Sequence, residues 1–160
     1  MWGKNRRFRY SDNSDDSDIS MEGSLLIFKE ETYILRGLFF QVQNELGRYR
    51  NEKQYGDAFE HKLKENGIQY EREKILPMSF EGEQKGRNRI DFLVFGKIIV
   101  ELKHNPSFSR DDYYQCQRYL VSADMWLALL VNFQPKYVNI KRILNHQKYN
   151  EQGGFTYPSQ

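Results

Sequence analysis

The sequence is poor in the residues that build disulfide or zinc frameworks. Its one cysteine, Cys116, excludes an internal disulfide framework and any CxxC zinc site. A single thiol fits a reducing, intracellular setting, so we expect a cytoplasmic protein. The three histidines, His61, His104 and His146, show no metal-ligand spacing and predict no zinc centre.

Long apolar runs and a strong excess of one charge are also absent. No apolar segment approaches the roughly 20 residues that cross a bilayer, so we predict no membrane partner. The basic N-terminus is not followed by the apolar core of a signal peptide. With 24 Lys and Arg against 22 Asp and Glu, the net charge of +2 excludes a histone-like polycation and a strongly acidic tail protein. Nucleic-acid binding stays open, because a local basic patch is sufficient for it.

The composition changes near residue 25. Of the 160 residues, 39% are hydrophobic, and this is enough to fill the core of one domain. Residues 1–24 contain basic residues and then aspartates among serines, with too little aliphatic content to offset the entropy of ordering. We therefore predict a disordered tail over 1–24, a single domain over 25–145 and a polar C-terminal tail over 146–160.

Hydrophobic periodicity predicts the order of the elements in this domain. Apolar residues at helical spacing indicate helices over 29–46 and 51–66. A third helix over 109–122 has Ser109 as its cap and acids in its first turn. Strands are predicted over 68–73, 89–95, 97–103, 126–133 and 137–144. The order α-α-β-β-β-α-β-β predicts an α/β (α+β) fold, in which helices flank a mixed sheet.

Two carboxylates and one ammonium interrupt the most apolar strands. Asp91 lies in one strand, and Glu101 and Lys103 lie in the next. Buried acids are costly unless they are paired or bind a metal, so their presence needs an explanation. One explanation is structural: a salt-bridged strand end in which Lys103 pairs with Glu101 or Asp91.

The other explanation depends on the register of the hairpin. A three-residue turn centred on Gly96 places Asp91 opposite Glu101, whereas a two-residue turn at Gly96-Lys97 separates the two carboxylates between the faces. Two converging carboxylates suit Mg²⁺, with Mn²⁺ as a substitute. A lysine beside such an ion can orient the attacking water and offset charge on a phosphate. The first register therefore predicts phosphodiester hydrolysis.

A third carboxylate, Glu52, lies in the first turn of the second predicted helix. Its spacing from Tyr55 and Phe59 places it on the apolar stripe of that helix. The helix dipole alone is a sufficient reason for an acid at this position. The functional interpretation is an outer ligand that reaches the metal through water.

These features together resemble the PD-(D/E)XK nuclease superfamily. The span from about residue 25 to 145 is similar, more narrowly, to the GxxExxY family. The matching motifs are Asn44-Glu45-Leu46-Gly47, Glu52-Lys53-Gln54-Tyr55, Arg89 to Val94, Ile99 to Lys103, Gln115 to Leu120 and Leu129 to Phe133. The first glycine of the naming motif is Tyr49 here, and the N-terminal tail lies outside the family pattern.

The resemblance implies a restriction-endonuclease-like core and a role for each matched residue. Asp91 and Glu101 would be direct metal ligands and Glu52 an outer ligand. Lys103 would act on the water, and Gln115 would be an auxiliary polar group near the substrate. We therefore expect a Mg²⁺-dependent nuclease that hydrolyses phosphodiester bonds in nucleic acid, with DNA as the expected substrate.

Basic residues around these strands could bind the substrate phosphates. The candidates are Arg87, Arg89 and Arg110. An ordinary solvated surface is the alternative interpretation. The small size and the departure at Tyr49 also leave open a non-catalytic nucleic-acid- or protein-binding module that keeps the nuclease fold. Small nuclease folds often act in assemblies, so a homodimer or larger complex is a further candidate.

Overall fold

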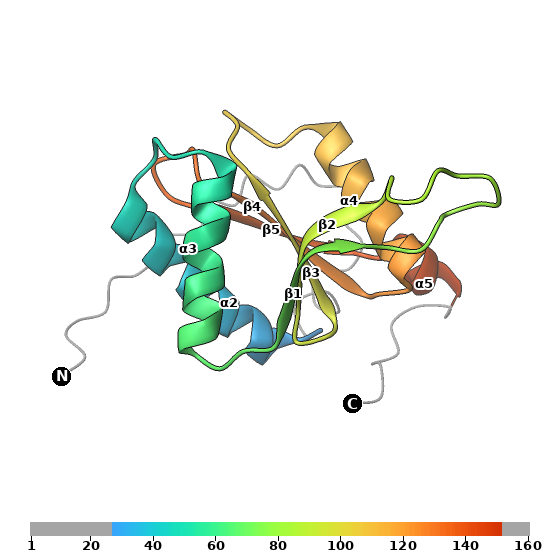
Figure 1. Cartoon of the computed structure of the whole chain (residues 1–160), viewed down its shortest axis with the longest axis horizontal. Coiled ribbons are helices and arrows are strands. Elements are labelled where there is room, and N and C mark those ends of the chain that lie inside the picture. The colour runs from blue at the N-terminus through green and yellow to red at the C-terminus, as the bar shows by residue number, and fades with distance from the viewer. Residues whose placement is uncertain (1–26, 152–160) are drawn as a thin grey trace.

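The computed structural model describes residues 27–151 (Figure 1). The predicted disordered tail over 1–24 and the last nine residues lie outside the described residues. The helices are α2 (Lys29–Leu46), α3 (Glu52–Glu65), α4 (Arg110–Ala123) and α5 (His146–Glu151). The strands are β1 (Tyr70–Ile75), β2 (Arg89–Val94), β3 (Ile98–Lys103), β4 (Leu127–Asn132) and β5 (Asn139–Leu144).

The strands form one mixed sheet in the order β1-β2-β3-β4-β5. Strands β3 and β4 are parallel, and the other neighbouring pairs are antiparallel. The connection from β3 to β4 contains α4, as a parallel pair requires. Helices α2 and α3 pack on one face of the sheet and α4 packs on the other (Figure 1). The predicted mixed sheet with flanking helices is confirmed.

The two helices nearest the charged strands begin with reciprocal caps. At the start of α3, the Gln54 backbone N–H donates to Asn51 Oδ1 at 2.9 Å, and the Asn51 backbone N–H donates to Gln54 Oε1 at 3.0 Å. At the start of α4, Ser109 and Asp112 form the same arrangement. Such capping boxes satisfy backbone donors that a helix leaves free. They fix the first turns of α3 and α4, and the predicted cap at Ser109 is confirmed.

Residues 146–151 differ from the loose polar tail expected after Asn145. They form α5, because Asn145 caps this segment: its Oδ1 accepts from the Lys148 N–H at 3.2 Å. The Asn145 side-chain amide also donates to the Met125 carbonyl at 2.9 Å, so the cap is tied to the connection between α4 and β4. Single polar side chains of this kind leave no periodic signal in the sequence.

Within the described range, no helix combines the length and the apolar character that are needed to cross a bilayer.

Candidate active site

The β2–β3 hairpin has the register that brings the carboxylates together. Phe92 pairs with Val100, Leu93 with Ile99 and Val94 with Ile98. The turn therefore consists of three residues centred on Gly96, which has φ +67°. The same register places Asp91 opposite Glu101, so the three-residue turn is the one that forms.

The two carboxylates take the place of the next backbone hydrogen bonds in the hairpin. The Asp91 N–H donates to Glu101 Oε1 at 2.9 Å, and the Leu102 N–H donates to Asp91 Oδ2 at 2.7 Å. Among the described residues, no hydrogen bond reaches Asp91 Oδ1 or Glu101 Oε2, and no fully buried side-chain oxygen lacks a partner. Each carboxylate is therefore anchored by one oxygen, and its second oxygen has no hydrogen-bond partner among the described residues.

The regular alternation of β2 is interrupted beside Asp91. Ile90 and Leu93 both pack on the α4 face, whereas Phe92 packs on the α2/α3 face. On β1, the pairing with β2 skips Glu73, which the register places opposite Asp91 and whose φ is +52°. A non-glycine residue with this φ is uncommon and marks a local irregularity of the strand. Both strands are thus distorted at the level of the carboxylates.

Burial and mutual repulsion make protonation of the two carboxylates more favourable. Glu101 is only 4% exposed, and its burial, followed by the charge of Asp91, raises its pKa to about 8. Burial also raises the pKa of Asp91, and Glu52 and Glu73 add to this effect. A divalent cation would reverse the balance by favouring both ionised forms. Two converging hard oxygen donors in a negatively charged site are a donor set that fits Mg²⁺ or Mn²⁺.

The Lys103 ammonium contacts two side chains of α4. Its Nζ donates to Gln115 Oε1 at 3.1 Å and lies 3.5 Å from Asp112 Oδ1. Its ion pair is therefore with Asp112, and the salt bridge to Glu101 or Asp91 considered from the sequence does not form. Asp112 was missed as a site residue because an acid in the first turn of a helix has a sufficient local explanation.

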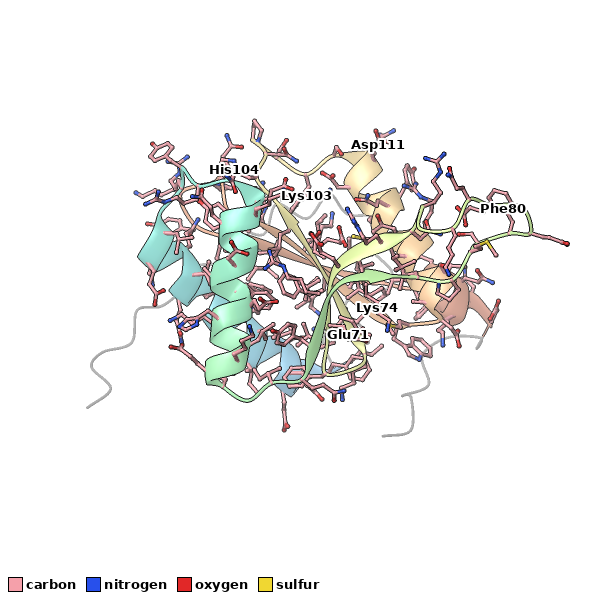
Figure 2. The ribbon with its side chains drawn as sticks, in the orientation of Figure 1. Glu71, Lys74, Phe80, Lys103, His104 and Asp111 are labelled. Atoms are coloured by element: carbon pink, nitrogen blue, oxygen red, sulfur yellow. The ribbon has the colours of Figure 1, made fainter. Side chains whose placement is uncertain are left out.

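Glu52 reaches the site from the first residue of α3. Its Oε1 accepts the backbone N–H of His104 at 3.3 Å. His104 directly follows Lys103, the last residue of β3 (Figure 2). The expectation that Glu52 lies on the buried stripe is wrong: Tyr55 and Phe59 are buried, but Glu52 is exposed. The reason is that α3 begins at Glu52, so this side chain projects beyond the end of β3.

The loop before α3 is held against β3 by His104. The His104 Nε2–H donates to the Arg48 carbonyl at 2.6 Å, and the ring stacks on Tyr55 with centroids 5.8 Å apart. Within residues 27–151, no group of three or more acidic, histidine or cysteine side chains is already assembled as a metal site. Asp91 and Glu101 converge, whereas Glu52 stands beside them, so its role as a ligand stays a prediction.

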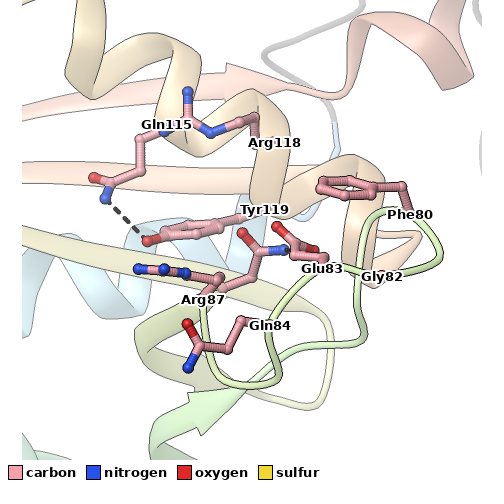
Figure 3. Close-up of a pocket in the computed structure, with 9 residues that line it drawn as sticks. Phe80, Gly82, Glu83, Gln84, Arg87, Gln115, Arg118 and Tyr119 are labelled. Carbon is pink, nitrogen blue, oxygen red and sulfur yellow. Dashed lines mark hydrogen bonds between the residues drawn. The ribbon is translucent and has the colours of Figure 1, made fainter.

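The four polar residues predicted to bind substrate occupy different positions. Gln115 and Arg87 line a cleft of about 550 Å³ between α4 and the loop that joins β1 to β2 (Figure 3). Arg89 and Arg110 are exposed at the first residues of β2 and α4. Arg118 also lines the cleft, but nothing in its sequence position distinguishes it from the other arginines.

Comparison with known proteins identifies the family. The model of the PD-(D/E)XK nuclease superfamily matches residues 29–143. The chain therefore belongs to the PD-(D/E)XK nuclease superfamily. It is also similar, with a TM-score of 0.45 and 12% sequence identity, to an alkaline exonuclease (LHK-Exo) from Laribacter hongkongensis, over 81% of this chain and 79% of that chain. No curated protein matches the chain. Membership of the narrower GxxExxY family stays a prediction.

Proposed function

We propose that this protein is a metal-dependent nuclease that hydrolyses phosphodiester bonds in nucleic acid, with DNA as the expected substrate. The observation that supports the proposal most strongly is the arrangement at the end of the β2–β3 hairpin. Asp91 and Glu101 face each other there, each with one free oxygen, and Lys103 is two residues further along β3. Superfamily membership favours the same chemistry.

Asp91 and Glu101 are the residues that would hold the metal. We propose Mg²⁺ as the ion, with Mn²⁺ as a substitute, because the donors are carboxylate oxygens. Such an ion supplies a polarised phosphate and a bound water of lowered pKa. Glu52 would act as an outer ligand through water, because it is anchored at the end of β3 beside the pair.

Lys103 would orient the attacking water or stabilise the phosphate charge. Its ammonium is fixed by two acceptors on α4, Gln115 Oε1 and Asp112 Oδ1. The two contacts hold the ammonium in place between β3 and α4. A fixed cation beside the reacting phosphate needs no rearrangement when negative charge develops, which is the source of electrostatic stabilisation.

The test compares DNA cleavage by wild type, Asp91→Asn and Lys103→Ala in Mg²⁺ or Mn²⁺ buffer. We expect each variant to lose roughly 100-fold or more in rate, because each removes a direct participant. Asp57→Asn and Lys97→Ala are matched controls, since both lie on the surface in ion pairs remote from the hairpin carboxylates. Full activity in both site variants would contradict the proposal.

Titration of Mn²⁺ into wild type and Asp91→Ala, followed by calorimetry, separates the nuclease from a non-catalytic binding module. We expect a binding isotherm for wild type that is lost in the variant. Wild type that binds nucleic acid, but neither binds Mn²⁺ nor cleaves in its presence, would instead support the binding module.

A further inference from the structure

The cleft beside α4 has a composition that the proposed chemistry does not explain. Gln115 and Tyr119 of α4 form its inner wall, and Phe80 and Arg87 come from the β1–β2 loop (Figure 3). Arg118 borders the cleft from the next turn of α4. Cations, amides and one exposed aromatic ring therefore surround a space of about 550 Å³.

The cleft lining carries two cations and one acid, so its net charge is positive. Within the described part of the chain, the side chains of Arg87 and Arg118 form no hydrogen bond or ion pair. Glu83 is the acid of the lining, and its Oε2 is already used: it accepts from the Ser79 N–H at 2.6 Å and from the Asn88 amide at 3.2 Å. Two guanidinium groups against one carboxylate favour an anionic ligand, and the planar donor fork of a guanidinium suits a phosphate.

Phe80 offers a surface for a flat apolar group. It is 64% exposed, although a large aromatic side chain usually gains free energy by being buried. Its backbone is held in a turn, because the Glu83 N–H donates to the Phe80 carbonyl at 3.2 Å. Stacking of a nucleobase on an exposed aromatic ring is a common, sequence-tolerant form of recognition.

The cleft is continuous with the candidate active site through one side chain. Gln115 Oε1 accepts from Lys103 Nζ at 3.1 Å, and Gln115 Nε2 donates to the Tyr119 hydroxyl at 2.9 Å (Figure 3). Because Gln115 and Tyr119 both line the cleft, a ligand in it lies next to the group that holds Lys103. A nucleotide there would be adjacent to the scissile phosphate.

We propose that this cleft binds one unpaired nucleotide of the substrate strand, with its phosphate on Arg87 and Arg118 and its base on Phe80. The proposal rests on the proposed nuclease function of the adjoining site. The volume lies in the range of sites that hold one small molecule, and a base pair with both of its strands does not fit such a space. The substrate class is therefore single-stranded or locally unpaired DNA.

The test measures binding without cleavage, by fluorescence anisotropy of the full-length chain in EDTA. The probes are a labelled single-stranded 12-mer and the same sequence as a blunt duplex. We expect wild type to bind the single strand about 10-fold more tightly. Arg87→Ala and Arg118→Ala should each weaken single-strand binding by roughly 3- to 10-fold and reduce the salt slope by about one.

Phe80→Ala separates stacking from charge. It should weaken single-strand binding by roughly 5-fold or more, leave the salt slope unchanged and leave duplex binding unchanged. Lys85→Ala is the matched control, because Lys85 is an exposed cation of the same loop that does not line the cleft. We expect it to change single-strand affinity by less than about 2-fold.

Two outcomes would overturn the proposal: duplex bound as tightly as the single strand, or Arg118→Ala and Phe80→Ala binding the single strand like wild type. Cleavage assays with metal are run in parallel. If the preference for the single strand is preserved but no metal-dependent cleavage is seen, the proposed nuclease function is refuted and the proposed nucleotide-binding cleft is supported. If metal-dependent cleavage is seen without that preference, only the proposed role of the cleft is refuted.

Discussion

The two faces of the sheet are filled in different ways. On the α2/α3 face, aromatic side chains pack against one another: the Phe59 ring lies 4.7 Å from Phe39 and 5.0 Å from Phe92, measured between centroids. On the α4 face, apolar side chains share the space with charged ones. Glu101 is buried there, and Lys103 contacts Asp112 across the interface with α4.

This difference indicates a division of roles. Close aromatic packing stabilises the fold, whereas buried carboxylates reduce stability unless a ligand compensates them. Burial raises the pKa of the Cys116 thiol to about 12, and the negative charge of Glu101 adds to this rise. The carboxylate therefore also affects an apolar part of this face. We infer that packing on the α2/α3 face offsets the free-energy cost of the buried charges on the α4 face.

Phe59→Ala should strongly destabilise the protein by disrupting the packing on the α2/α3 face. The ring is fully buried, so its removal leaves a cavity and lowers the free energy of unfolding by about 3–4 kcal/mol. Urea denaturation followed by circular dichroism measures the change. Tyr33→Ala is the control, because Tyr33 is 80% exposed on α2 and should change stability by less than about 0.5 kcal/mol. A loss below about 1 kcal/mol for Phe59→Ala would contradict the assigned role.

The elements and the hairpin were predictable because each depends on local pattern. The helices 29–46 and 109–122 were predicted to within one residue at each end, since apolar spacing and the Ser109 cap define them. The pairing of Asp91 with Glu101 followed from one choice, a three-residue turn at Gly96, and the register confirms it. Where short-range chemistry decides the structure, one sequence is enough.

Contacts between distant segments could not be predicted in this way. The approach of Asp112 to Lys103 depends on how α4 docks against the sheet, and the cleft position of Arg118 depends on the β1–β2 loop. Glu73 looked like any exposed residue of an edge strand, although the register sets it opposite Asp91. These positions follow from tertiary packing, which periodicity does not encode.

Glu101→Gln should stabilise the protein at alkaline pH by removing a buried charge from the α4 face. The folded-state pKa of Glu101 is about 8, above the ordinary value of 4.5. Between these pH values the unfolded chain has released a proton that the folded chain keeps, so the stability of wild type falls as pH rises through this window. An amide cannot ionise, and its oxygen can still accept the Asp91 N–H. The variant should therefore be more stable than wild type at pH 8, by about 1–4 kcal/mol in metal-free buffer.

Urea denaturation of both proteins in EDTA between pH 4 and pH 9 measures this effect. The gain should be largest at pH 8 or above and should vanish near pH 4, where the wild-type side chain is protonated in both states. Glu30→Gln, at an exposed position of α2, should show no such dependence. A variant that is less stable than wild type at pH 8 would show that Glu101 is not destabilising in its ionised form.

Asp112→Asn should produce the smallest effect and tests how the α4 face holds its lysine. The amide oxygen can keep the capping hydrogen bond from the Ser109 N–H, but the charge opposite Lys103 Nζ is lost. We expect the cleavage rate to fall by roughly 3- to 10-fold, equivalent to about 1 kcal/mol, with little change in KM. Asp111→Asn removes the same charge from the same helical turn at an exposed position. Equal losses in both variants would assign the effect to the helix terminus, whereas a loss confined to Asp112→Asn would assign it to the position of Lys103.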